Sequence, residues 1–200
     1  MTALLRGAAL PLSMQPPPIP IDKKALNRVA ELLAKAKKPI MYVGQGANDA
    51  PEELMALAEA AQIPFTTTLH AMGVMSEHHA HSMHMLGMHG AAYANYAIQE
   101  SDLIIAIGSR FDDRTTGVLN KYAPVAKEAH ENGTGGFVHF DIEPSQIGRV
   151  VNPTIAVAGD AKHALQQLVP IVQRNPAVNT ADRAGWLQRC VELKKEFPFQ

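Results

Sequence analysis

Two short runs of the chain carry side chains that could hold a ligand with a flat ring at one end and phosphates at the other. Residues 82–90 place three methionines and two histidines around a glycine. Residues 110–114 contain two arginines and two aspartates. Methionine forms an adaptable apolar wall, and arginine offers a planar charged fork that matches phosphate and carboxylate groups. Together these runs predict a pocket for a large, partly aromatic and partly anionic ligand.

The arginine-rich run admits two interpretations. On a helix, Arg110 and Arg114 would form ordinary surface ion pairs with Asp112 and Asp113, each contributing less than about 1 kcal/mol. The run directly follows a strand-like apolar segment, however, and ligands of open parallel sheets bind where strands end. We therefore favour recognition of a diphosphate or a carboxylate.

Glycine ends three strand-like segments of the chain, at Gly44, Gly108 and Gly159. A glycine there lets the backbone turn sharply and lets a ligand approach closely. Gly44 and Gly46 begin a glycine-rich loop, but Asp49 replaces the third glycine of the G-x-G-x-x-G fingerprint. An acid at this position would repel a diphosphate unless it caps the next helix, so a standard NAD site is a poor fit. The glycine amides could still face a phosphate.

Two acidic residues at strand ends have a structural and a functional interpretation each. Asp141 could accept hydrogen bonds from ribose hydroxyls, or it could form the turn before Pro144. Asp160 could contact the ligand or cap the following helix, and capping is favoured.

A group of histidines, at positions 78, 79, 81 and 84, invites a metal interpretation. The spacing follows no metal motif, and no carboxylate or cysteine completes a ligand shell, so we predict a solvated loop and no metal site. His89 is different because we expect it at the start of a helix, where it could donate to the ligand.

Composition excludes several classes of function. The chain has 200 residues, a net charge of −1 and a single cysteine, Cys190. The charge balance gives no reason to expect a nucleic-acid or membrane-surface partner, and no apolar run is long enough to cross a bilayer. One cysteine cannot form an internal disulfide, which fits a reducing compartment.

Strand and helix patterns alternate along the chain. Strands are predicted at 40–43, 65–68, 103–107, 137–141 and 155–158, and helices at 21–38, 51–62, 90–99, 160–172 and 181–197. This order predicts an α/β fold, a three-layer sandwich with a parallel sheet and helices on both faces. Residues 121–136 are the least regular stretch, and within it the run 131–136 reads as an exposed, mobile loop. We divide the chain into a proline-rich interdomain linker (1–20), a nucleotide-binding domain (21–180) and a terminal helix that begins a further linker (181–200).

The chain resembles the central domain of acetohydroxyacid synthase (acetolactate synthase), a thiamine-diphosphate enzyme of branched-chain amino acid synthesis. The resemblance covers about residues 37–168. The most specific runs are Leu86-Gly87-Met88-His89-Gly90 and Arg110-Phe111-Asp112-Asp113-Arg114.

The resemblance implies a six-stranded parallel sheet that binds FAD. The residues that it would place along FAD are Gly44, Gln45, Gly46, Asn48, Thr68, Leu69, Leu86, Gly87, Met88, His89, Gly108, Ser109, Arg110, Asp112, Arg114, Asp141, Ile142, Gln146, Gly159, Asp160 and Ala161. Arg114 and Met88 would also position the 2-oxo acid substrate, Arg114 by facing its carboxylate and Met88 as an apolar wall.

The resemblance also implies what lies outside this chain. The full enzyme would be a homodimer or homotetramer that contains N- and C-terminal domains, thiamine diphosphate and Mg²⁺, with a possible regulatory subunit. We find no thiamine-binding motif here, so we expect the chain alone to be inactive. A fungal-like loop near His130 favours a mitochondrial location, and a bacterial protein would be cytoplasmic. The alternatives are the middle domain of a related thiamine-diphosphate carboligase or decarboxylase, and a structural module with a vestigial nucleotide cleft.

Overall fold

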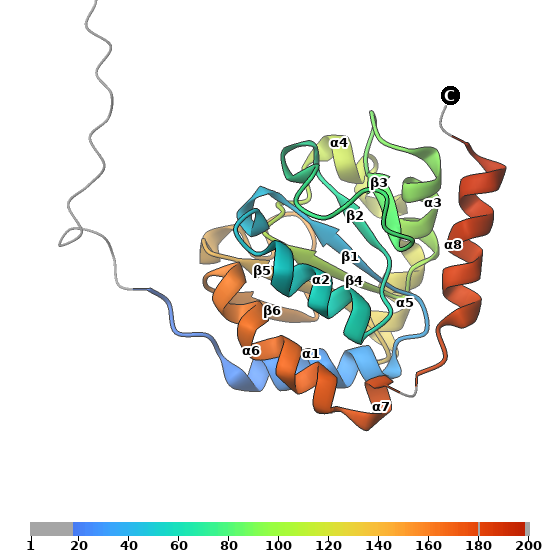
Figure 1. The fold of residues 1–200 in the computed structure, drawn as a ribbon. Coiled ribbons are helices and arrows are strands. Elements are labelled where there is room, and N and C mark those ends of the chain that lie inside the picture. Colours follow the sequence, from blue (N-terminus) through green and yellow to red (C-terminus); the bar gives the residue numbers. More distant parts are fainter. Residues whose placement is uncertain (1–17, 180, 199–200) are drawn as a thin grey trace, which may run out of the picture.

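A computed structural model describes residues 18–179 and 181–198. Its six strands form one parallel sheet in the order β3-β2-β1-β4-β5-β6 (Figure 1). The strands are β1 (Pro39–Val43), β2 (Phe65–Thr67), β3 (Ser82–Met85), β4 (Leu103–Ile107), β5 (Gly136–Asp141) and β6 (Ile155–Ala158). The predicted parallel sheet with helices around it is confirmed.

Helices cover both faces of this sheet, so the molecule has three layers (Figure 1). The α-helices are α1 (Lys23–Lys35), α2 (Pro51–Ala60), α3 (Ala92–Glu100), α4 (Asp113–Thr116), α5 (Pro124–Glu131), α6 (Ala161–Arg174), α7 (Pro176–Asn179) and α8 (Ala184–Glu196). Short 3₁₀ turns are η2 (Gln45–Ala47), η3 (Leu69–Ala71), η4 (Leu119–Lys121) and η5 (Pro144–Gln146).

Side chains that alternate along the strands divide the hydrophobic core into two clusters, one on each face of the sheet. On β1, Met41 and Val43 point to the side covered by α1, α2 and α6, whereas Ile40 and Tyr42 point to the side of α3, α5 and α8. Successive side chains of a strand point to opposite faces, so a strand covered on both sides must be apolar throughout. All five residues of β1 and of β4 are buried for this reason.

The sequence interpretation of three regions was wrong. Residues 124–131, within the stretch expected to be the least regular, form helix α5, in which Ala126 and Ala129 are buried. The expected solvated histidine loop contains the edge strand β3, where His84 has a left-handed φ of 56° at a register shift against β2. His89 lies in the turn before α3 rather than at the start of that helix.

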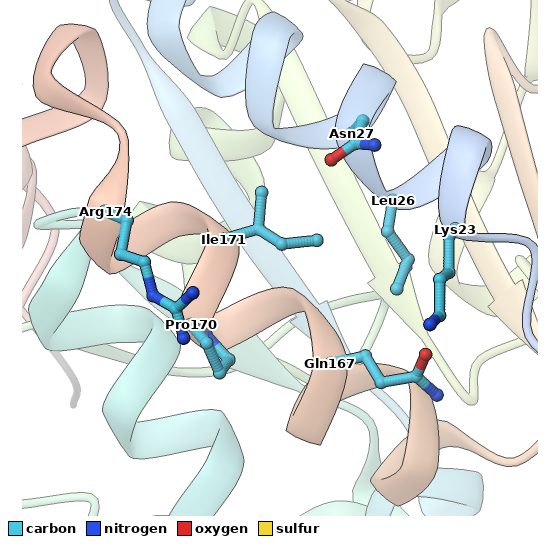
Figure 2. Close-up of a pocket in the computed structure, with 7 residues that line it drawn as sticks. All are labelled: Lys23, Leu26, Asn27, Gln167, Pro170, Ile171 and Arg174. Carbon is cyan, nitrogen blue, oxygen red and sulfur yellow. The ribbon is translucent and has the colours of Figure 1, made fainter.

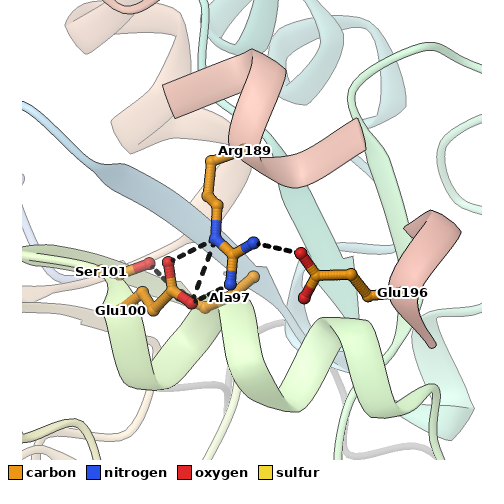
Figure 3. Close-up of polar contacts among 5 residues, drawn as sticks. All are labelled: Ala97, Glu100, Ser101, Arg189 and Glu196. Carbon is orange, nitrogen blue, oxygen red and sulfur yellow. Dashed lines mark hydrogen bonds and ion pairs between the residues drawn. The ribbon is translucent and has the colours of Figure 1, made fainter. Parts of the chain in front are cut away.

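The terminal helix α8 packs on the same core as the rest of the sheet. Trp186 is buried, and its indole Nε1 donates to the Pro39 carbonyl at 2.9 Å. Arg189 donates to Glu100 at the end of α3 at 2.8 Å and to Glu196 within α8 (Figure 3). The division at residue 180 remains a prediction, and that part of the expected linker which precedes residue 18 lies outside the described residues.

Candidate functional site

The carboxyl ends of the six strands meet at one edge because all strands run in the same direction. Chain order reverses between the neighbouring strands β1 and β4, since the chain passes outward from β1 to β3 and then returns to the other side of β1. Ligands of open α/β sheets bind in the crevice at such a reversal. The glycine-rich loops that follow β1 and β4 lie at this point.

A pocket of about 380 Å³ opens at the strand reversal, and we call it the switch-point pocket. All of its lining residues are among those that the resemblance implied for the cofactor. They are Gln45, Gly46, Gly108, Arg110, Asp141, Ile142 and Ala161. These seven residues come from the ends of four strands, which only the folded sheet brings together.

A second pocket of about 350 Å³, the methionine pocket, lies over the ends of β2 and β3. Its lining residues are Thr68, Leu69, His70, Met85, Leu86, Gly87, Met88, His89, Asp112, Arg114 and Thr115. His70, Met85 and Thr115 are the ones that were not predicted. Leu69 and Met88 are 65% and 72% exposed, so the wall offers bare apolar surface to a ligand or a partner.

Six predicted residues do not line either pocket: Gly44, Asn48, Ser109, Gln146, Gly159 and Asp160. Two of them, Asn48 and Asp160, have a structural role. Asn48 donates through Nδ2 to the His70 carbonyl at 3.1 Å and so ties η2 to η3. Asp160 accepts from the His163 backbone N–H at 2.8 Å, and the favoured interpretation of Asp160 as the cap of α6 is confirmed.

The glycines at the strand reversal let two loops touch. A Cβ on Gly44 would lie 2.2 Å from the Gly108 carbonyl oxygen, closer than any real contact allows. The amides of Gly44 and Gly46 donate to Ile107 and Gly108 carbonyls at 2.8 Å and 3.1 Å. The expectation that these two amides face a phosphate is therefore wrong. Asp49 does not cap the next helix either, because the cap position of α2 is Ala50.

The loop after β4 turns its charges outward around a buried aromatic residue. Phe111 has a left-handed φ of 54° and is only 1% exposed, and its ring packs 5.6 Å from that of Tyr42. Its neighbours Arg110 and Asp112 are exposed. Within the described part of the chain, the guanidinium groups of Arg110 and Arg114 form no ion pair. Both are thus free to meet an anionic group.

Short hydrogen bonds fix the segment that carries Arg114. The Asp112 carboxylate accepts from the Thr115 N–H at 3.0 Å and caps the one-turn helix α4. The Met88 N–H donates to the Arg114 carbonyl at 2.8 Å. The two residues expected to position a substrate are therefore joined through their backbones. The Tyr42 hydroxyl donates to Thr115 Oγ1 at 3.2 Å. Burial raises the pKa of the Tyr42 phenol to about 12.

Several polar groups at the strand ends fit a polar ligand. The hydroxyls of Thr67, Thr68 and Ser109 are buried and have no hydrogen-bond partner among the described residues. Buried polar groups normally find partners, so such atoms indicate an absent one. Asp141 accepts from the Glu143 N–H at 2.9 Å, which confirms its turn role, and it also lines the switch-point pocket. Its contact with a ribose remains a prediction.

Two other pockets of the described surface contain none of the predicted site residues, and one of them lies beside α5. A pocket of about 330 Å³ lies between α1 and α6, lined by side chains such as Lys23, Gln167 and Arg174 (Figure 2). None of the predicted site residues lies there. No group of three or more potential metal ligands occurs within residues 18–179 and 181–198. In the same residues, no helix has the length and apolar character needed to span a membrane.

Comparison with known proteins agrees with this fold. Residues 26–168 match the family model of the thiamine pyrophosphate enzyme central domain. The chain therefore belongs to the thiamine pyrophosphate enzyme family and contains its central domain.

Relatives that the chain matches include acetolactate synthases. It is 42% identical over 179 residues to the mitochondrial acetolactate synthase catalytic subunit of Saccharomyces cerevisiae, covering 88% of this chain and 25% of that protein. It is 38% identical over 177 residues to the large subunit of acetolactate synthase isozyme 1 of Escherichia coli, covering 88% and 29%. The chain thus spans between a quarter and a third of the length of these relatives.

Proposed function

We propose that this chain is the FAD-binding central domain of an acetolactate synthase catalytic subunit. The observation that carries the proposal is the switch-point pocket, whose lining residues are all ones expected along FAD. The names of the relatives support the choice of enzyme, since acetolactate synthases match over most of this chain.

The two pockets match the two halves of a flavin dinucleotide in chemistry. In the methionine pocket, Met88, Leu69 and Leu86 provide apolar surface for a flat ring. In the switch-point pocket, Arg110 provides an unpaired charge for the diphosphate, and Asp141 provides a carboxylate for a ribose. The buried hydroxyls of Thr68 and Ser109 lack protein partners, which fits a polar ligand in the same region.

The proposal extends to the full protein. It would use thiamine diphosphate and Mg²⁺, held mainly by other domains, to join two pyruvates, or pyruvate and 2-oxobutyrate, with loss of CO₂. Arg114 and Met88 would orient the 2-oxo acid at a neighbouring thiamine site. The full protein would form a homodimer or homotetramer and could bind a regulatory subunit. The fungal relatives are named mitochondrial and the bacterial ones are not, so a fungal protein would lie in mitochondria and a bacterial one in the cytoplasm.

A calorimetric titration with FAD tests the proposal. We expect saturable binding that Arg110→Ala weakens by about tenfold to hundredfold, because a hydrogen bond to a charged group contributes about 1.5–3 kcal/mol. Arg174→Ala is the matched control, since Arg174 is an exposed arginine at the far end of α6, roughly 20 Å along the helix from Ala161. The control should bind like the wild type.

Three results would contradict the proposal. Equal weakening by both substitutions would mean that FAD binds through general charge rather than in the switch-point pocket. An absence of binding to FAD and ADP alike would favour the structural module with a vestigial cleft. Binding of ADP without FAD would favour a related thiamine-diphosphate decarboxylase or carboligase.

A further inference from the structure

We propose that His139 is a positioning residue that holds the loop 108–111, and with it Arg110, in its ligand-binding conformation. This inference rests on the proposed nucleotide site, but its structural part can be tested without any ligand. His139 was not singled out from the sequence, because a histidine inside an apolar strand carries no motif.

His139 is a buried neighbour of the loop that follows β4. It is a residue of β5 with 1% exposure, and its Nε2 is 2.8 Å from the Ser109 carbonyl oxygen. Its ring meets the Phe111 ring edge-on, with centroids 5.3 Å apart and planes at 89°. One side chain therefore contacts both residues that flank Arg110 in the sequence.

The loop held by His139 needs support. Gly108 and Phe111 have left-handed φ values of 62° and 54°, and a left-handed conformation is strained for a bulky residue such as Phe111. Strained backbone persists only where its surroundings determine it. Among the described residues, the bond from His139 to Ser109 is the one side-chain hydrogen bond to residues 108–111. Without that bond, the loop would depend on backbone bonds and on the packing of Phe111.

The chemistry of the ring fits a fixed role. A carbonyl oxygen only accepts hydrogen bonds, so Nε2 must carry a proton and donate. Burial lowers the pKa of His139, which keeps the ring neutral, and Nδ1 has no hydrogen-bond partner among the described residues. A purely packing role would be served better by an apolar residue, because burying an unpaired nitrogen costs free energy.

His139 also lies near a second residue of the pocket. Its Nε2 lies 3.9 Å from the Asp141 carboxylate, and Asp141 lines the switch-point pocket together with Arg110. A displaced ring would thus disturb the proposed diphosphate contact and the proposed ribose contact together.

Three substitutions separate positioning from packing. In His139→Gln, the side-chain amide can still donate to Ser109. His139→Leu keeps the volume approximately and removes the donor. His139→Asn is a second variant that loses the hydrogen bond, because the shorter asparagine side chain cannot bring its amide to the Ser109 carbonyl. Val138→Ala is the control, since Val138 is buried on the opposite face of the same strand and should lower stability without touching the loop.

The variants are compared by amide hydrogen exchange at residues 108–111 and by FAD titration. We expect His139→Leu and His139→Asn to speed exchange at these amides and to weaken FAD binding about tenfold, as for one lost hydrogen bond. His139→Gln should stay within about threefold of the wild type, and Val138→Ala should lower the melting temperature with unchanged FAD affinity.

Two outcomes would overturn the inference. One is wild-type exchange at the loop in every folded donor-loss variant, whether or not FAD binds. The other is loss of affinity in Val138→Ala equal to that in His139→Leu, which would reduce His139 to general stability. If the wild-type chain bound no FAD, the proposed function would fail, and the exchange data alone would still decide on the positioning role.

Discussion

Arg110 illustrates how much a single charged residue depends on its buried neighbours. Three features of its loop accompany its exposure. Phe111 beside it has a left-handed backbone, and the Ser109 carbonyl is bound by His139. The loop also touches the loop after β1 where Gly44 approaches Gly108. The sequence shows the arginines but not these contacts. Arg110 and the glycines at the strand ends could be predicted because their residue types and positions are informative. His139 and Thr115 could not, because only their contacts in the folded chain reveal their roles.

Glycine substitutions test the close approach of the two loops. We expect Gly44→Ala to lower the free energy of unfolding by about 1–3 kcal/mol and to weaken FAD binding, because its Cβ would collide with the Gly108 carbonyl. Gly185→Ala, in α8 with open space around its Cβ position, should instead raise stability by about 0.5–1 kcal/mol. Urea unfolding of both variants is the measurement, and equal effects would contradict the account.

Buried histidines make stability depend on pH. Burial is the largest cause that lowers the pKa of His139 and of His81 below the ordinary value of 6.5. The unfolded chain then binds more protons than the folded chain below pH 6.5, so the free energy of unfolding should fall as the pH drops from 7 to 5. Chemical unfolding across this range checks the slope, which His139→Gln should make shallower. A stability that rises toward pH 5 would contradict the assignment.

At the scale of elements, apolar patterns and helix signals were sufficient for most of the fold. Strands β1, β4 and β6 could be predicted because continuous apolar runs end before a glycine, and β5 because an apolar run interrupted by His139 ends in Asp141. Strand β3 could not, because its Ser-Met-His-Met sequence lacks a strand pattern and it pairs at the edge through an irregular register. Helix α5 was missed since it is short and buries only alanines.

The docking of α8 gives a prediction for an element. Trp186→Phe should lower the free energy of unfolding by about 1–3 kcal/mol, because the buried Pro39 carbonyl would lose its donor. Val191→Ala, on the exposed side of the same helix, should change stability by less than about 0.5 kcal/mol. Thermal unfolding of the two variants compares them. A similar small effect of both would mean that α8 contributes little to the fold.

At the scale of the whole molecule, the chain corresponds to one part of longer relatives. It carries the central domain, and it spans between a quarter and a third of the length of the relatives described above. We expect the isolated chain to form no acetolactate from pyruvate, even with thiamine diphosphate, Mg²⁺ and FAD present. A colorimetric assay for acetoin after acid decarboxylation measures this, and turnover that copurifies with the chain would contradict the expectation.

The location of FAD on this chain is the most direct test of the account. Amide chemical shifts of the ¹⁵N-labelled chain would be recorded as FAD is added. We expect shifts at residues 44–48, 86–89, 108–115 and 141–142, at the carboxyl ends of the strands. The amides that line the pocket between α1 and α6 should not shift. Shifts that cluster at the α1–α6 groove, or that are absent at saturating FAD, would contradict the assignment of the strand ends as the flavin site.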